Sequence, residues 1–552
     1  MAFFEFNIAL TGLFASQRGL QVTSNNITNA NTTGYSRQEV KQKASRPLSG
    51  IGVGMTGTGV DITGLNRVRD SYIDQKLWSQ NPRLGEYNIK VTQNSMIESA
   101  FGEPSEKGFT AVFNELFNSI SNVGTNPSSK ENKVVVQKQM ETFAKYYNNI
   151  SGTLSNYQEN LNFDLKSTVN EINSLSTRLA SLNEQIMNAE IYGDEASSFR
   201  DERDNCLDRL SQLINIEVEE TEYELKGNTI SKMRVKAAGQ VLVDHVNGNT
   251  LELTVRDKKL YESDVEGLYD IKWSNGLSFD MYDVNMSGEL KAIIDLRDGC
   301  GTGTSDSYCG IPYYIKRIDG YVQQFAKTMN EEYSRTKDGY IEIKNCSINN
   351  AAYMQRDSNG KISFYDASKS VIATNIEEKD CSYSTKYALF TCTTGNKTGV
   401  PKSADELTDY SDITAANFSI SKELYDDPTK MRTVYEYDSN GKEVNPSDTS
   451  FILNILAQKD NKDMFREGDP KDYMVAIFSE LGINAKEAGM YQNTQKSVVN
   501  NLTNQRMSVS QVDISEEFTY LIKYQQAYQA SAKMMTTIDE IYNTTIFKLG
   551  NF

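Results

Sequence analysis

The longest regular pattern in the sequence is an alternation of three- and four-residue steps across residues 154–189. Its members are Leu154, Gln158, Leu161, Leu165, Thr168, Ile172, Leu175, Leu179, Leu182, Ile186 and Ala189. This spacing puts the side chains on one seam of a helix, and no proline interrupts it. A helix of five heptads is longer than the helices of ordinary globular domains, so the pattern predicts a rod rather than a compact enzyme core. We expect Gly193 to end it.

Both ends of the chain carry shorter seams with the same spacing. The N-terminal seam is Phe3, Phe6, Leu10, Leu13, Gln17, Leu20, Ser24 and Ile27, and the C-terminal seam is Leu521, Tyr524, Tyr528, Ser531, Met535, Ile538 and Tyr542. Polar positions weaken an isolated helix pair, and such a pair would leave Phe4, Ile8, Ile522 and Ile541 uncovered. The terminal helices are therefore predicted to assemble between copies of the chain. A pair that only forms part of one small domain is the alternative.

A polar stretch, NNITNANTTGYSR at residues 25–37, follows the N-terminal seam. Asparagine and threonine side chains compete with helical hydrogen bonds, and Gly34 can adopt a positive φ. The stretch therefore predicts the end of the first helix. Half of residues 50–59 are glycine, which predicts an extended, bendable connector.

The rest of the chain divides by its period. Residues 70–214 read as helical, residues from 216 alternate like hairpin strands, and helical stretches follow at 287–298 and 311–335. Residues 336–450 carry strand signals, and the pentapeptide DSNGK at 357–361 and 438–442 predicts two hairpin turns. Helical pattern returns from 450 to the end, so the plan places the two termini side by side.

The predicted fold class is mainly α with β-rich inserted domains. The molecule should be elongated, with paired N- and C-terminal coiled-coil helices, a long-helix bundle domain and a distal β-rich domain. The expected divisions are 1–66 with 505–552 as the terminal coiled coil; 67–215, 286–335 and 450–504 as the helical rod; 216–285 as a β-hairpin region attached to the rod; and 336–450 as a variable β-rich outer domain.

Charge and composition exclude several classes of partner. The net charge of -17 makes a nucleic-acid backbone or an anionic lipid surface an improbable ligand. No stretch approaches the roughly 20 apolar residues that span a bilayer, and the N-terminus lacks the pattern of a signal peptide. Residues 1–60 hold five bases against two acids and residues 508–552 three against five, so the two ends should attract each other weakly.

The candidate chemical motifs all have simpler interpretations. Residues 52–57 match G-x-G-x-x-G, but a β-like segment follows where a nucleotide site needs a helix. His245 is the only histidine, which rules out H-E-x-x-H and leaves a surface histidine as the better interpretation. DSNGK lacks the later ligands of a calcium loop. The six cysteines contain no C-x-x-C pair, and disulfides and free thiols stay equally open. No catalytic residue, cofactor or metal site is predicted.

Several stretches carry a family resemblance. NNITNANTTGYSR resembles the N-terminal signature of bacterial flagellar axial proteins, the rod, hook and hook-associated family. SVSQVDISEEFTYLIKYQQAYQASAKMMTTIDEIYNTTI at the C-terminus resembles the hook-associated members at the first hook–filament junction. GTGVDITGLNRVRDSYID (57–74), FRDERDNCLDRLSQL (199–213) and MSGELKAIIDLRD (286–298) resemble the same group. The match covers about 1–335 and 450–552, and no motif is assigned in 336–450.

The resemblance implies a structural protomer and no enzymatic activity. Its expected partners are further copies in an axial ring, the hook protein on one side, and the second junction protein and filament on the other. It also implies export by the flagellar type III apparatus without a cleaved signal peptide, with a dedicated chaperone at the C-terminal segment, and no membrane insertion or nucleic acid. The terminal segments would be disordered in the monomer and fold as paired helices in the polymer.

The residues expected at the assembly interface come from both termini. They are Phe6, Leu10, Leu13, Leu20, Asn25, Asn26, Ile27, Asn29, Asn31, Gly34, Tyr35, Arg37, Leu521, Tyr524, Gln525, Gln526, Tyr528, Met535 and Ile538. Another axial protein, such as hook or distal rod protein, is the alternative identity because the N-terminal signature is shared. A displayed adhesin or enzyme in residues 336–450 is a further alternative.

Overall fold

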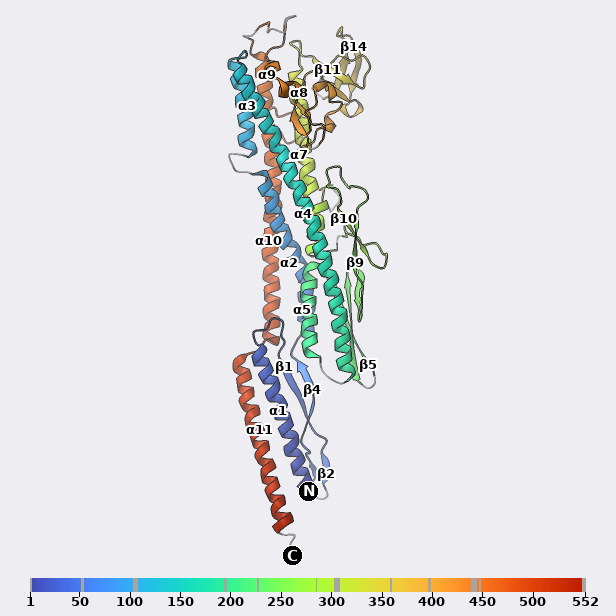
Figure 1. The fold of residues 1–552 in the computed structure, drawn as a ribbon, viewed down its shortest axis with the longest axis vertical. Helices are drawn as coiled ribbons and strands as arrows, with labels where there is room; N and C mark the ends of the chain where they lie inside the picture. Colours follow the sequence, from blue (N-terminus) through green and yellow to red (C-terminus); the bar gives the residue numbers. More distant parts are fainter. Residues whose placement is uncertain are drawn as a thin grey trace.

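The molecule is long and narrow, with both chain ends at the same tip (Figure 1). The computed structural model describes residues 2–50, 54–102, 108–192, 196–225, 228–283, 285–301, 308–357, 360–395, 399–437, 444–445 and 448–548. From the tip with the termini upward we call its parts the stalk, the rod and the head. Long helices dominate the stalk and rod, and small sheets lie along the rod and in the head. This arrangement confirms the predicted fold class.

The stalk pairs the first and last helices and adds a long hairpin. Its elements are α1 (Ala2–Asn29), β1 (Gln38–Ala44), β2 (Leu48–Gly50), β3 (Gly54–Thr56), β4 (Val60–Arg67), α11 (Ile514–Asn543) and a π-helical turn at Thr544–Lys548. β1 pairs antiparallel with β4, and β2 with β3. Gly50 and residues 54–56 of the glycine-rich segment therefore lie in paired strands, a pairing that the expected extended, bendable connector did not include. Residues 51–53 lie outside the described part.

The helix stop in the polar stretch is where the pattern predicted it. α1 continues through Asn25 and Asn26 and ends at Asn29. The Asn29 carbonyl then accepts a hydrogen bond from the Thr32 backbone N–H at 2.9 Å, and Gly34 follows with a φ of 80°. Asparagine side chains and a left-handed glycine thus turn the chain away from the helix axis.

Long helices form the rod. They are α2 (Ser71–Phe101), α4 (Lys130–Ile191), α5 (Ser197–Leu213), α6 (Glu289–Asp298), α7 (Ile311–Tyr333) and α10 (Pro470–Ser510). α4 begins well before the predicted seam because Ser129 caps it: the Ser129 hydroxyl accepts from the Asn132 N–H at 3.2 Å. It ends at Ile191, and Gly193 lies outside the described residues.

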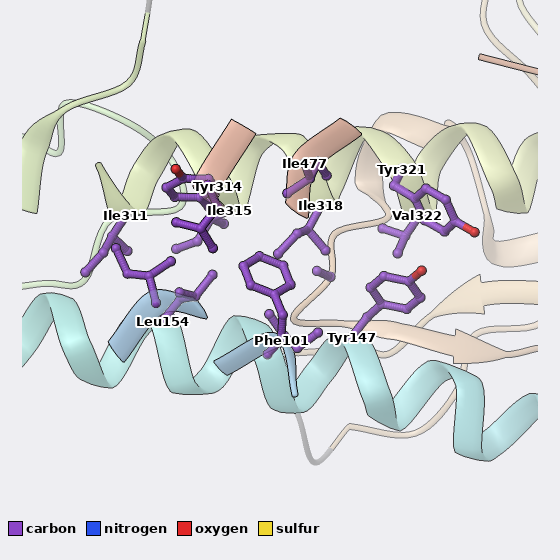
Figure 2. Packing of buried hydrophobic residues seen from close by; sticks show 14 of the residues in the cluster. Phe101, Tyr147, Leu154, Ile311, Tyr314, Ile315, Ile318, Tyr321, Val322 and Ile477 are labelled. Carbon is purple, nitrogen blue, oxygen red and sulfur yellow. The ribbon is translucent and has the colours of Figure 1, made fainter. Parts of the chain in front are cut away.

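The rod core forms where α4 and α7 run together, with α2 and α10 closing the sides (Figure 2). Tyr147 of α4 stacks on Tyr321 of α7 with ring centroids 5.3 Å apart. Phe101 from the end of α2 and Ile477 from α10 enter the same layer. Because these four segments are distant in sequence, burial of their side chains is what joins the helices into one body.

The β region attached to the rod is built from two small sheets. β5 (Ile216–Leu225), β6 (Asn228–Ala237), β7 (Gln240–Asp244) and β8 (Asn247–Gly248) form one in sequential order, and β9 (Leu251–Val255) pairs with β10 (Tyr269–Trp273). Asn173 of α4 holds the second sheet, since its amide exchanges hydrogen bonds of 2.8 and 2.7 Å with the Leu251 backbone. His245 lies in the turn after β7, half-buried against Met187.

The head combines helices with short strands. Its elements are α3 (Phe109–Thr125), β11 (Ile341–Cys346), β12 (Tyr353–Arg356), β13 (Ile362–Tyr365), β14 (Val371–Ile376), β15 (Tyr383–Thr385), β16 (Phe390–Cys392), β17 (Phe418–Ile420), α8 (Lys422–Asp426) and α9 (Ser450–Ala457), with 3-10 turns at Glu378–Asp380, Ala404–Glu406, Tyr410–Asp412, Pro428–Lys430 and Gln458–Asp460. The five-stranded sheet has the order β14-β13-β12-β11-β15.

The first DSNGK repeat lies between two strands that pair as an antiparallel hairpin, as its sequence predicts, although Ser358 and Asn359 lie outside the described residues. Asp357 and Lys361 join β12 to β13, and the Asp357 N–H donates to the Lys361 carbonyl at 3.0 Å. The second repeat lies outside the described residues. Within the described part of the chain no helix is long and apolar enough to cross a membrane, and no cluster of potential metal ligands is found.

Gln158 provides a test of how the rod holds the neighbouring loop. Its buried amide donates to Asp264 Oδ1 and the Arg297 carbonyl, both at 2.9 Å, and accepts from the Val265 N–H at 3.0 Å. Gln158→Leu keeps the seam apolar but leaves these three groups without their hydrogen-bond partner. Each buried group left unpaired lowers the stability by about 1–3 kcal/mol. We expect a lower thermal midpoint for the rod, measured by circular dichroism.

The control is Gln185→Leu on the same helix, whose amide contacts only Ser181 one turn away. It should leave the midpoint nearly unchanged. Equal midpoints for Gln158→Leu and the unmodified chain would show that the three hydrogen bonds add nothing to stability.

Candidate assembly interface

The two stalk helices run antiparallel and meet through glycines. A Cβ atom at Gly19 would lie 2.6 Å from the ring of Tyr524, and one at Gly12 would lie 3.2 Å from Ser531 Oγ. One heptad step along α1 therefore matches one heptad step back along α11. Any larger side chain at Gly19 would push the helices apart, so these glycines set the distance between them.

The next position in the same row is polar. Asn26 lies one heptad beyond Gly19, and Glu517 one heptad before Tyr524; both side chains are almost fully buried. Asn26 donates to the Gln38 carbonyl at 2.9 Å and accepts from the Gln38 N–H at 3.0 Å and the Tyr35 hydroxyl at 2.8 Å. A buried, fully bonded asparagine fixes the start of the hairpin against the helix.

Glu517 is a buried carboxyl at the centre of this contact. Burial raises its pKa, while a hydrogen bond from Asn26 and the charge of Arg37 partly oppose that rise. Tyr35 responds to the same surroundings: burial and the nearby carboxylates of Asp201 and Glu517 raise its pKa to about 12. Burial at the polar end of the stalk thus disfavours the charged forms of both Glu517 and Tyr35.

Arg37 joins the two chain ends directly. Its guanidinium contacts Glu516 of α11 at 3.0 Å and Glu39 at 2.8 Å, and its backbone N–H donates to the Ser510 carbonyl at 2.9 Å. The weak attraction that the charge balance predicted is therefore present as one specific ion pair. The Arg37–Glu516 pair is partly exposed, so it adds little to the stability of the stalk. Its role is to fix the position of Arg37 beside α11.

Gly34 brings the polar stretch against the rod. A Cβ atom at this position would lie 1.9 Å from Asn205 Oδ1 of α5, and the φ of 80° already disfavours other residues. The next residue but one, Ser36, donates its backbone N–H to Asp201 Oδ2 at 3.2 Å. The chain therefore leaves α1 along a path that only glycine fits.

Buried ion pairs continue this contact into the rod. Arg67, the last residue of β4, contacts Asp201 at 2.9 Å and Asp204 at 2.6 Å. Arg69 binds Asp74 through two nitrogens, at 2.7 and 3.0 Å. These partners come from the stretch 199–213 and from the start of α2, so the network couples the orientation of the stalk to the rod.

A second branch reaches the end of α10. Arg506 contacts both oxygens of Asp208, at 3.0 and 2.8 Å, and Trp78 Nε1 donates to the same carboxylate at 2.7 Å. α10 ends four residues later at Ser510, and Asp513 caps α11 by accepting from the Ser515 and Glu516 N–H groups. The expected domain division at 504/505 falls inside α10, whereas the helix break lies at 511–513.

The predicted interface residues occupy different depths. Half-buried are Phe6, Leu10, Leu13, Leu20, Ile27, Asn29, Gly34, Tyr35, Arg37, Leu521, Tyr524 and Met535; buried are Asn26 and Ile538; exposed are Asn25, Asn31, Gln525, Gln526 and Tyr528. The closest helix contact therefore lies beside the apolar row of α1 and not on it. The seven-residue spacing of Gly12 and Gly19 was the available signal, and the pattern of large apolar residues concealed it.

Large apolar side chains remain uncovered on the outer side of the stalk. Phe518 and Ile522 of α11 are 50% and 53% exposed, and Ile514, one turn earlier, is 43% exposed. Ile541 and, on α1, Phe14 are also more than half exposed. The four-residue spacing of the first three forms a continuous stripe, which monomeric proteins rarely leave in water.

Gly34→Ala tests the turn between stalk and rod. The added methyl group collides with Asn205 and disfavours the positive φ, so we expect faster protease cleavage within residues 30–38 of the full-length chain in its assembled state. Gly34→Ala combined with Asn205→Ala removes the collision but not the φ penalty and should restore resistance only in part. Resistance equal to that of the unmodified chain would contradict the close approach.

Glu517→Gln tests the buried carboxyl. Because its pKa is raised, the paired helices favour the protonated form, so Glu517 supports pairing at low pH and this support is lost as pH rises through that pKa. Glu517→Gln should therefore increase helix content and protease resistance of the stalk at neutral pH and make no difference in acid. Glu540→Gln, at an exposed position of α11, is the control. Weaker pairing of Glu517→Gln at neutral pH would contradict this.

Known proteins match the sequence over nearly its whole length. The helical domain of flagellar hook-associated protein FlgK matches residues 94–338, the flagellar basal body rod FlgEFG protein C-terminal family matches 503–546, and the flagella basal body rod protein family matches 6–35. The terminal matches thus fall mainly on α1 and α11, and the longest match falls on much of the rod, the β region attached to it and α3 of the head.

Individual relatives share the same name. Flagellar hook-associated protein 1 of Bacillus subtilis is 27% identical over 99% of this chain and 98% of its own length, and that of Escherichia coli is 21% identical over 98% of each. The hook junction protein FlgK of Burkholderia pseudomallei aligns in structure with 14% identity and a TM-score of 0.47, covering 80% of this chain and 100% of its own. The chain is thus similar over nearly its whole length to flagellar hook-associated protein 1, a structural component of the extracellular bacterial flagellum and not an enzyme.

Proposed function

We propose that this chain forms the junction between hook and filament by polymerising through its paired terminal helices. The observation that carries this proposal is the uncovered apolar stripe Ile514, Phe518 and Ile522 on α11. The inner side of α11 meets α1 through small and polar residues. No described residue covers the stripe on the outer side of α11. Neighbouring copies in a ring supply such a cover.

The energetics favour coupling between folding and assembly. Ordering roughly a hundred terminal residues costs on the order of 100 kcal/mol of chain entropy. The contacts of Gly12 and Gly19 bury little apolar area within one molecule, because glycine has no side chain to contribute. Packing of the α11 stripe against neighbours adds the missing burial, so the stalk becomes stable in the polymer.

The matches favour the junction over other axial positions. The families that match residues 6–35 and 503–546 are those of basal body rod proteins, and these segments form the stalk. The match at 94–338 is to the helical domain of a hook-associated protein and covers most of the rod. Hook or distal rod protein, the alternative identity, does not account for this longer match.

The proposed partners follow from that position. Copies of the chain would meet each other around the axis, the hook protein on one side, and the second junction protein and filament on the other. We also propose export in unfolded form by the flagellar type III apparatus without a cleaved signal peptide, with a chaperone that holds the apolar C-terminal segment. The exposed stripe on α11 supports this last point, since it needs protection before assembly.

Charged substitutions on α11 test the assembly role. Leu521→Asp and Tyr528→Asp place a carboxylate on the half-buried and exposed faces of the helix, so each should abolish incorporation at the hook tip. The rod should stay folded, with an unchanged thermal midpoint. Incorporation is measured by electron microscopy of isolated hooks and by the presence of filaments.

Phe163→Asp is the matched control, because Phe163 is an exposed aromatic residue on α4, away from the stalk. It should assemble normally. Normal filaments from Leu521→Asp and Tyr528→Asp would refute the role of α11. Protein found along the whole hook instead of at its tip would favour the alternative identity.

A further inference from the structure

Two of the cysteines face each other where the chain passes from α6 to α7. Cys300 and Cys309 are partners in an isolated antiparallel bridge. The Gly310 N–H donates to the Gly299 carbonyl at 3.1 Å, so the hydrogen bond of the bridge flanks the cysteines and does not join them. Cys300 and Cys309 therefore occupy a non-hydrogen-bonded antiparallel pair.

This position has the backbone geometry that a disulfide needs. Opposed Cα atoms in a non-hydrogen-bonded pair lie about 4.5 Å apart, and their side chains approach more closely than at any other position. Disulfides form at Cα separations of about 4.4–6.8 Å. The two thiols are free in the structure, with Cys300 next to the Tyr261 hydroxyl and Cys309 Sγ 3.9 Å from Glu480. A rotation of the two side chains is therefore all that is needed to bring the sulfur atoms of Cys300 and Cys309 together.

The other cysteines are placed less well for a link. Cys346 of β11 stands opposite Tyr383, so Cys381 lies two residues away on the diagonal. Diagonal neighbours in an antiparallel pair are about 7–8 Å apart between Cα atoms, beyond the disulfide range. Cys206 and Cys392 belong to α5 and β16, in the rod and the head.

We propose that Cys300 and Cys309 form a disulfide after the chain has reached the cell exterior. The flagellum is extracellular, where disulfides form and persist, whereas cytosolic thiols are kept reduced. The link ties the end of α6 to the start of α7, and α7 packs on α4 in the rod core. It would thereby lock two helices of the rod once the protein is outside.

The chemistry requires an oxidant, for which a low-molecular-weight disulfide is sufficient. The thiolate of Cys309, the more accessible of the two, attacks the small disulfide, forms a mixed disulfide and releases one small thiol. The sulfur of Cys300 loses its proton, attacks Cys309 Sγ and releases the second small thiol. Two protein thiols are oxidised and one small disulfide is reduced to two thiols.

The test uses the full-length chain, purified in reductant and transferred to oxidised glutathione. Free thiols are then alkylated under denaturing conditions and counted by mass spectrometry, and peptides are mapped. We expect the count to fall from six to four, with a single link between Cys300 and Cys309. Six free thiols, a link elsewhere or stable glutathione adducts on Cys300 and Cys309 would overturn the proposal.

Matched variants separate this link from the others. Cys346→Ser combined with Cys381→Ser should still lose two thiols, whereas Cys309→Ser should form no link within the chain. Glu480→Gln gives a rate readout: burial and the Glu480 charge raise the pKa of Cys309 to about 11, so removal of the charge should accelerate closure at neutral pH. An unchanged rate of closure in Glu480→Gln would show that Cys309 is not the attacking thiol.

Discussion

The close antiparallel approach of α1 and α11 is the contact from which the arrangement of the stalk follows. Gly12 and Gly19 let the backbone of α1 come within reach of Ser531 and Tyr524, and this fixes which residue of one helix stands beside which residue of the other. Small residues give such a contact a unique register, because a shift by one turn would bring larger side chains into the same space. The outer apolar stripe of α11 stays exposed in the single molecule.

The polar end of the stalk converts this register into an orientation relative to the rod. Asn26 bonds to the first residue of the hairpin, Gly34 contacts Asn205, and Arg67 and Arg69 bind carboxylates of α5 and α2. Paired buried charges are costly to separate, since each would be left without a partner.

In the rod and head, α4 gives the molecule its length and other elements cover its apolar seam. α4 passes from the base of the rod into the head (Figure 1). α7 and the small sheets pack along α4, whereas α10 packs mainly on α2. Polar residues of α4 have structural roles: Gln158 and Asn173 reach out to the loops and strands that cover the helix. The head, in contrast, is built from strands of three to six residues.

The sequence by itself determined the periodic features: a long helix through 154–189, a helix stop within the polar stretch 25–37, hairpin strands after 216 and two terminal helices that meet. These features follow from the spacing of residues that are close in the sequence, so they can be read from the sequence directly. Only the tertiary structure decided the register of α1 on α11, the pairing of 48–50 with 54–56, and the ion pairs that Arg67 and Arg69 make with α5. Glycines leave no trace in an apolar pattern, and ion pairs between segments more than a hundred residues apart depend on how the helices pack.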